Sequence, residues 1–267
     1  MLQRIVVPTD FSSCADRATT VALKLAAITG SRITFVHYFD KPWFSSEQEL
    51  RHQNAHNIKE HVINLARNAE LKLPEHVDFY AKSGKLLKEL PEFMVKHLVS
   101  MVIMGTKGEN GQSGNALGSH TINFIKHTDT PVLAVPENGT FHNLEKMLYV
   151  TDYKSITGVT FDTVLKLGEL FNAVITIMQI GIKSESGSIR RESPFAMDNL
   201  IYSYKNIEKK ALDDENVIHG LQKYIAENQP SFIALSVKDE GIMEKLFNQS
   251  AFHEMLSAEH IPLLAAN

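Results

Sequence analysis

The stretch RIVVPTDF, residues 4–11, returns later in the chain as KMLYVTDY, residues 146–153. Each copy is an apolar run that ends in threonine, aspartate and an aromatic residue, and the two aspartates, Asp10 and Asp152, lie 152 − 10 = 142 positions apart. A short apolar run followed by turn-forming residues is typical of a strand buried on both faces. The repeat therefore predicts two copies of one structural unit.

A helical pattern follows each of these strands. In the first copy Ser12 or Ser13 can cap the helix and Gly30 ends it; in the second, Asn172 stands 142 positions after Gly30 and is the next most tolerant residue for the left-handed conformation at a helix end. A second β-rich run follows each helix, at residues 32–37 and 174–179. Strands that alternate with helices predict parallel sheets built from right-handed βαβ units.

The far ends of the two copies also match. Residues 130–135, TPVLAV, return as residues 261–266, IPLLAA, with an offset of 262 − 131 = 131. The second copy is therefore shorter by 142 − 131 = 11 residues, and we expect the loss in the counterpart of the long helical region 45–73. The predicted fold class is α/β, with two tandem open parallel five-stranded sheets flanked by helices, in domains 1–137 and 143–267.

Composition excludes several classes of protein. The chain has 267 residues with a net charge of −4, which does not support a nucleic-acid or anionic-membrane surface. Cys14 is the only cysteine, so neither an internal disulfide nor a cysteine-based zinc site can form. The sequence has no apolar run of membrane-spanning length, and its first residues read as a strand rather than a signal peptide. We expect a cytoplasmic protein without nucleic-acid or membrane partners.

A glycine-rich stretch, MGTKGENGQSGNALGSHT at residues 104–121, follows an apolar run. In an open parallel sheet, ligands bind beyond the carboxyl ends of the strands. A loop there can direct backbone N–H groups toward an anion, and a helix starting near Gly118 and Ser119 adds its own free N–H groups. The stretch therefore predicts a phosphate site.

The spacing of this stretch is specific: Gly105, two residues, Gly108, nine residues, then Gly118 and Ser119. It resembles the motif of the universal stress protein family, in the branch that binds ATP. The resemblance includes VPTD at residues 7–10 and PVLAV at residues 131–135, and so covers most of residues 1–137. It implies a five-stranded parallel sheet that commonly dimerises through its last strand.

The resemblance also implies a set of binding residues for ATP, with Mg²⁺ on the phosphates. Strand ends would hold the adenine and ribose, with the backbone of His37 toward the base or sugar; the glycines would let the backbone approach the ribose and phosphates; and the residues that open the next helix would hold the phosphate chain. These residues are, in order, Pro8, Thr9, Asp10, His37, Gly105, Gly108, Gly118, Ser119, His120 and Thr121.

Simpler roles remain open for several of these residues. Asp10 can serve only to cap the first helical region, and Ser119 is also an ordinary helix cap. Lys107 is either a phosphate ligand or a solvated loop charge. The two additional glycines of the loop, Gly111 and Gly114, exceed the motif and are consistent with a lid that orders over the phosphates.

The second copy lacks the motif. With the offset of 131, the three motif glycines correspond to Ser236, Asp239 and Gln249, and only Ser250 matches, at the position of Ser119. An acidic side chain where phosphate would approach opposes binding. We therefore expect a degenerate second domain and one nucleotide per chain.

Three functions remain in competition: a nucleotide-dependent regulatory protein, a nucleotide-independent scaffold or holdase-like module, and a slow ATPase. The intact motif favours the first over the second. The sequence has neither a phosphate-loop lysine motif nor a nucleophile elbow, which indicates at most slow ATP hydrolysis and no catalytic residue. The helical pair His52 and His56 has no evident third ligand at suitable spacing, so no metal site is expected. The last strands, residues 132–135 and 263–266, are predicted to pair with each other as an intrachain pseudo-dimer, and a homodimer is also open.

Overall fold

The computed structural model describes residues 2–107, 117–139, 144–152, 158–180, 182–183, 189–190, 204–212, 216–237 and 242–267. The chain divides into two compact units. The first comprises residues 1–114, 118–124 and 132–138, and the second comprises residues 115–117, 125–131 and 139–267.

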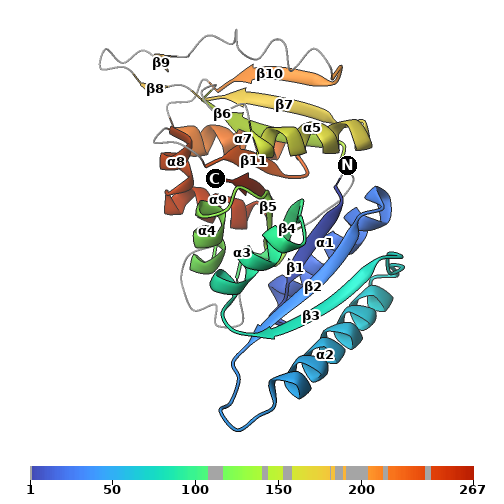
Figure 1. Cartoon of the computed structure of the whole chain (residues 1–267). Coiled ribbons are helices and arrows are strands. Elements are labelled where there is room, and N and C mark those ends of the chain that lie inside the picture. Colours follow the sequence, from blue (N-terminus) through green and yellow to red (C-terminus); the bar gives the residue numbers. More distant parts are fainter. Residues whose placement is uncertain are drawn as a thin grey trace. The chain divides into compact units, whose positions relative to one another are not determined.

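The first unit alternates strands with helices (Figure 1). Its elements are β1 (Arg4–Pro8), α1 (Ser13–Thr29), β2 (Arg32–Phe39), α2 (Glu47–Asn68), β3 (Val77–Ser83), α3 (Leu86–Lys96), β4 (Met101–Gly105), the start of α4 (Ser119–Lys126) and β5 (Val132–Val135). All neighbouring strands are parallel, in the order β3-β2-β1-β4-β5. This confirms the predicted α/β class and the five-stranded parallel sheet.

The strand order determines where the helices lie. The chain moves outward from β1 to β2 and β3, and then returns past β1 to β4 and β5. Because right-handed crossovers are the rule, α1 and α2 cover one face of this sheet and α3 and α4 the other. Figure 1 shows α2 and α3 on opposite sides of β3. The connections from β1 lead to one edge of the sheet and those from β4 lead to the other, so the topological switch point lies between β1 and β4.

The first helix begins and ends as its sequence predicts. Ser12 is the N-cap of α1 and accepts a hydrogen bond from the Ala15 N–H at 3.3 Å. Gly30 ends the helix in the left-handed conformation, with φ at 68°, which a residue without Cβ adopts at little cost. The face of α1 that contains Ala18, Ala22 and Leu25 is buried against the sheet.

The second unit repeats this topology. Its described elements are β6 (Lys146–Thr151), α5 (Val159–Phe171), β7 (Val174–Gln179), β8 (Ile182–Lys183), β9 (Ile189–Arg190), β10 (Ile207–Ala211), α7 (Val217–Asn228), β11 (Ile233–Ser236), α8 (Ile242–Phe247), α9 (Ser250–Ala258) and β12 (Leu263–Ala266). Its parallel sheet has the order β10-β7-β6-β11-β12. With β6 in the place of β1, this is the strand order of the first unit.

The second unit has the predicted helix end after α5 and a third strand at β10. Asn172 ends α5 in the left-handed conformation, with φ at 50°, in the role that Gly30 has in the first unit. The third strand, which alternates weakly in sequence, is β10. After β7 the described residues include the two-residue antiparallel pair β8–β9. The shortened counterpart of residues 45–73 lies largely outside the described residues.

No helix in the described part of the chain combines the length and the apolar character needed to cross a membrane.

Candidate functional site

A cavity of about 620 Å³ lies at the carboxyl ends of the strands of the first unit. Its walls come from the residues that end or follow β1, β2 and β4, from the first turns of α1 and α3, and from the start of α4. The lining residues are Pro8, Thr9, Asp10, Ala15, Val36, Tyr38, Asp40, Gly84, Lys85, Leu86, Leu87, Met104, Gly105, Thr106, Lys107, Gly118, Ser119, His120 and Thr121. This is the position where ligands bind in open parallel sheets, beside the point at which the chain reverses its direction of travel.

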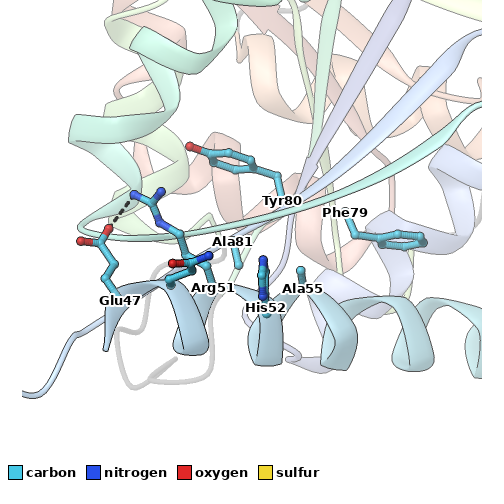
Figure 2. Close-up of a pocket in the computed structure, with 8 residues that line it drawn as sticks. Glu47, Arg51, His52, Ala55, Phe79, Tyr80 and Ala81 are labelled. Carbon is cyan, nitrogen blue, oxygen red and sulfur yellow. Dashed lines mark hydrogen bonds and ion pairs between the residues drawn. The ribbon is translucent and has the colours of Figure 1, made fainter. Parts of the chain in front are cut away.

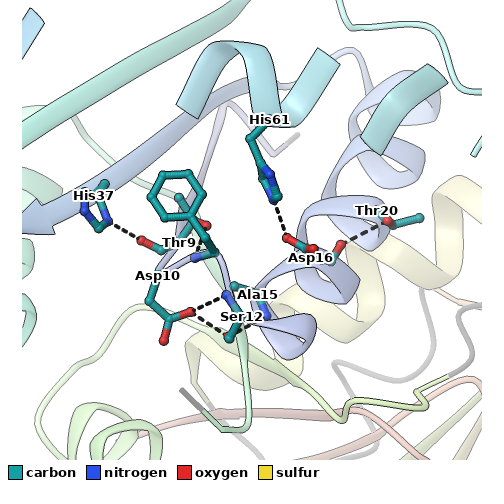
Figure 3. A network of polar contacts seen from close by, with 9 residues as sticks. Thr9, Asp10, Ser12, Ala15, Asp16, Thr20, His37 and His61 are labelled. Atoms are coloured by element: carbon teal, nitrogen blue, oxygen red, sulfur yellow. Dashed lines mark hydrogen bonds and ion pairs between the residues drawn. The ribbon is translucent and has the colours of Figure 1, made fainter. Parts of the chain in front are cut away.

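Asp10 is held in place at the end of β1. One oxygen of its carboxylate accepts hydrogen bonds from the Ser12 N–H at 3.1 Å and the Ser12 hydroxyl at 2.6 Å (Figure 3). Ser12 in turn caps α1. The cap of the helix is therefore the serine, and Asp10 orients that serine while it lines the cavity.

The start of α4 supplies unpaired backbone donors. The Gly118 N–H donates to the Thr106 carbonyl at 2.5 Å, and the Gly118 carbonyl accepts from the Ile122 N–H at 3.1 Å, so the helix begins at Ser119 as predicted. Within the described residues, the N–H groups of Ser119, His120 and Thr121 have no hydrogen-bond partner. Such groups at the start of a helix favour an anion.

The two described glycines of the motif are also closely packed within the protein itself. A Cβ on Gly105 would lie 2.7 Å from the backbone carbonyl carbon of Cys14, where α1 begins. A Cβ on Gly118 would lie 2.7 Å from the Thr106 carbonyl oxygen. Both glycines are thus required by the close approach of the protein's own backbone. They allow α1 and α4 to start close to the end of β4, which shapes the cavity.

Thr121 is likewise engaged within the protein. Its hydroxyl donates to the Gly105 carbonyl at 3.0 Å, and its side chain is buried. The donor that the sequence assigned to a phosphate therefore fastens α4 to the end of β4. Ser119 and His120, by contrast, are exposed at the cavity wall.

His37 is not among the residues that line the cavity, and its side chain points away from it; its predicted role rests on its backbone and stays a prediction. Successive side chains of a strand point to opposite faces, and Val36 and Tyr38, its neighbours on β2, line the cavity instead. The His37 ring turns the other way, where its Nδ1 donates to the Thr9 carbonyl at 2.8 Å and the ring lies 5.0 Å from that of Phe11 (Figure 3).

Tyr38 is a wall residue that sequence reasoning missed. Its hydroxyl oxygen is buried and has no hydrogen-bond partner among the described residues. Burial, together with the nearby Tyr80 and Glu89, raises the pKa of this phenol well above its ordinary value, so it stays protonated. A protonated hydroxyl can both donate and accept a hydrogen bond.

A second group of missed residues begins α3. Gly84 turns the chain at φ 138°, and Lys85, Leu86 and Leu87 then line the cavity. The available signal was a Gly-Lys pair directly after the β-rich run VDFYAKS, residues 77–83. Lys85 and Lys107 thus line a cavity to which Asp10 and Asp40 also contribute. The remaining predicted glycine, Gly108, and the loop glycines Gly111 and Gly114 lie outside the described residues.

A contact between α2 and α1 stabilises the turn that leads into the site. The His61 Nε2 lies 2.6 Å from an oxygen of the Asp16 carboxylate (Figure 3). The ring of Phe11 lies between His37 and His61, and its backbone has φ at 64°, an unusual value for a residue with a Cβ. The two histidines hold this turn between them.

The corresponding end of the second sheet differs in its residues. Ser236 ends β11 where Gly105 ends β4, and Gln249 precedes α9 where Gly118 precedes α4. Gln249 is the N-cap of α9 and makes no side-chain cap bond. Asp239, the predicted acidic residue, lies outside the described part.

Residues 1–136 match the model of the Universal stress protein family. The chain belongs to this family. Universal stress protein MJ0577 of Methanocaldococcus jannaschii is 26% identical over 155 residues, which is 51% of this chain and 95% of that protein.

Two solved structures are similar in fold to nearly the whole chain. A universal stress protein from Archaeoglobus fulgidus superposes with a TM-score of 0.68 at 13% identity, with 100% of this chain and 97% of the other covered. The functionally unknown protein PA1789 from Pseudomonas aeruginosa gives a TM-score of 0.58 at 10% identity, with 99% and 92% covered. At these identities the likeness concerns the fold alone.

Proposed function

We propose that the first unit binds ATP, and that the protein is a nucleotide-dependent regulatory protein of the stress response. The observation that carries this proposal is the cavity of about 620 Å³ at the switch point of the first sheet, which falls within the usual range of ligand sites. Membership of the universal stress protein family supports the same conclusion.

The phosphate chain fits the start of α4. The N–H groups of Ser119, His120 and Thr121 have no partner in the part of the chain that the structure describes. Together with the exposed Ser119 hydroxyl and the ammonium group of Lys107 they are donors, as phosphate oxygens require. Mg²⁺ would enter on the triphosphate. These residues would bind and orient the phosphates.

The base and sugar fit the other walls. Pro8, Val36 and Met104 present apolar surface to a flat ring, and the Tyr38 hydroxyl offers a group that can both donate and accept. The carboxylate of Asp10, fixed by Ser12, can accept hydrogen bonds from ribose hydroxyls. The donor set of the cavity therefore suits a nucleotide.

Binding with at most slow hydrolysis suits this set of residues. Fast phosphoryl transfer needs an oriented nucleophile and neutralisation of the charge that develops on the phosphates. Among the described residues, the wall supplies backbone donors and two lysines, while the Asp10 carboxylate is already engaged by Ser12. ATP would then act by favouring the conformation to which it binds more tightly.

Calorimetric titration with Mg·ATP tests the site. Ser119→Glu places a carboxylate at the start of α4, where an acidic side chain favours the helix but repels phosphate. We expect one nucleotide per chain in the unsubstituted protein and at least about a tenfold loss of affinity in this variant, which corresponds to roughly 1.4 kcal/mol.

Ser250→Glu is the matched control, because Ser250 opens α9 as Ser119 opens α4. It should leave binding unchanged. Hydrogen exchange should slow on addition of Mg·ATP in β1, β4 and α4 of the first unit and not in the second. A stoichiometry near two, or equal affinity in both glutamate variants, would contradict the assignment.

A further inference from the structure

The outer strand of the first unit has an unpaired edge. Within the described residues β3 pairs only with β2. The Ile33 N–H donates to the His76 carbonyl at 2.9 Å and the Gly84 N–H to the Phe39 carbonyl at 3.0 Å. Because peptide groups alternate along a strand, the even-numbered residues of β3 direct their N–H and C=O groups toward β2. The odd-numbered residues, Val77, Phe79, Ala81 and Ser83, direct theirs outward.

A groove lies along this strand. A cavity of about 580 Å³ is lined by Glu47, Gln48, Arg51, His52 and Ala55 of α2 and by Phe79, Tyr80 and Ala81 of β3. Figure 2 shows Ala81 directed toward α2 and Tyr80 on the opposite side of the strand. The Tyr80 ring packs there against Phe93 of α3, at a centroid distance of 4.8 Å. An added strand would therefore find side-chain contacts on both faces.

The sequence of this edge is complementary to itself. When two copies of β3 run antiparallel about Tyr80, the opposed residues have numbers that sum to 160. Asp78 then faces Lys82 of the second copy, which places opposite charges together, and Phe79 faces Ala81, which places a large side chain beside a small one. Val77 faces Ser83.

The hydrogen-bond pattern agrees with this register. An antiparallel ladder alternates hydrogen-bonded and non-hydrogen-bonded pairs. The outward-facing residues Val77, Phe79, Ala81 and Ser83 pair only with one another, so their free groups can bond. The backbone groups of Asp78, Tyr80 and Lys82 already point toward β2. These residues therefore occupy the non-hydrogen-bonded pairs of the ladder between the two copies. A shift by one residue would lose this match.

The equivalent edge of the second unit lacks these features. The outer strand β10 reads IEKKA, and an antiparallel pair about its central residue would set Lys209 against a second Lys209. Like charges directly opposite each other are unfavourable, and lysine is a common means of protecting a strand edge. The chain thus protects one outer edge and leaves the other complementary to itself.

We propose that β3 of the first unit is a docking edge for β3 of a second copy of this chain, paired antiparallel about Tyr80. The charges already present support the arrangement: Asp78 lies 3.5 Å from Arg32 and Lys82 lies 2.6 Å from Glu89, so the cross-copy pairs extend existing ion pairs. A seven-residue ladder buries less surface than a permanent interface, so the dimer is weak and concentration-dependent.

Sedimentation velocity over a range of protein concentrations tests the edge. Ala81→Pro removes an outward N–H and leaves the β2–β3 ladder intact, so the dimer should weaken at least about tenfold, by roughly 1.4 kcal/mol. Ala211→Pro makes the same change at an outward position of β10 and should leave the dimer unchanged. A protein that stays monomeric, or a dimer that both variants leave intact or both abolish, would overturn the proposal.

Disulfide trapping tests the register. In the proposed pair the two Tyr80 Cα atoms lie about 4.5 Å apart, within reach of a disulfide. Under mild oxidation Tyr80→Cys should form a covalent dimer, whereas Lys82→Cys, which faces Asp78, should not. Cys14, the native cysteine, is buried and should not contribute. Equal trapping of both variants, or trapping of Lys82→Cys alone, would exclude this register.

Discussion

The two units share one strand order and differ at the end of one strand. In the first unit β4 ends in Gly105, against which the backbone of Cys14 packs; in the second, β11 ends in Ser236. Helix starts differ in the same way, with Gly118 before α4 and Gln249 before α9. The comparison shows that this topology tolerates a side chain at these positions, whereas the shape of the cavity in the first unit does not.

Exchanging the strand-end residues should produce the largest effect. Gly105→Ser places a Cβ 2.7 Å from the Cys14 backbone, so α1 or β4 must shift. We expect the first unit to lose about 1–3 kcal/mol of unfolding free energy, as for overpacked cores. Native-state hydrogen exchange, which reports on each unit separately, is the appropriate measurement.

The reverse exchange, Ser236→Gly, is its control. It should cost the second unit only roughly 0.5–1 kcal/mol, through greater freedom of the unfolded chain. A loss in the first unit no larger than that in the second would mean that the close approach of Cys14 to Gly105 does not limit its stability.

The next largest effect is a difference between the two units in how their stability depends on pH. His253 of α9 is buried, its Nε2 has no partner among the described residues, and burial lowers its pKa below the ordinary value of 6.5. The unfolded chain therefore binds a proton near pH 6.5 while the folded unit resists it. The stability contributed by neutral His253 is full above that pH and is lost as the pH falls through the lower folded pKa.

Hydrogen exchange at pH 7 and pH 5, corrected for intrinsic rates, should thus show the second unit weakening. His253→Met should reduce this pH dependence. In the first unit burial also lowers the pKa of His97, but that side chain is much nearer the surface, so His97→Gln should change the pH dependence little. If His253→Met leaves the second unit equally sensitive to acid, the burial of this imidazole is not the cause.

The smallest effect concerns the ends of α1 and α5. Gly30 and Asn172 both end their helices in the left-handed conformation, and a Cβ on Gly30 would meet no atom within 4 Å. Gly30→Asn should therefore cost less than about 1 kcal/mol, and Gly30→Val about 1–2 kcal/mol, since a branched residue is disfavoured there. Chemical unfolding of the first unit would compare the two, and equal costs would contradict the argument.

Much of the fold could be predicted because it depends on local patterns. The repeat of residues 4–11 at residues 146–153, the Ser12 cap and the Gly30 and Asn172 helix ends are all read within a few residues. The strand β10 was harder to predict, because apolar and polar residues alternate only weakly in the exposed outer strand IEKKA. The pairing of residues 132–135 with 263–266 stays a prediction, as do the domain boundaries 1–137 and 143–267.

The site could be predicted only in part. Pro8, Asp10 and Ser119 lie at the cavity, since they follow directly from strand and helix ends. Lys85 and Tyr38 were missed, because their contribution depends on which elements meet at the strand ends and on which face of β2 a residue occupies. The side chain of His37 points to the other face for the same reason.

The sequence by itself determined the class of fold, the two copies and the family, because strand periodicity, caps and motif spacing are properties of neighbouring residues. Only the tertiary structure decided why Gly105 and Gly118 are glycines, that the Thr121 hydroxyl fastens α4 to β4, and which groups of β3 face outward. Each of these depends on distances between segments that are far apart in the chain. Packing, rather than local preference, sets those distances.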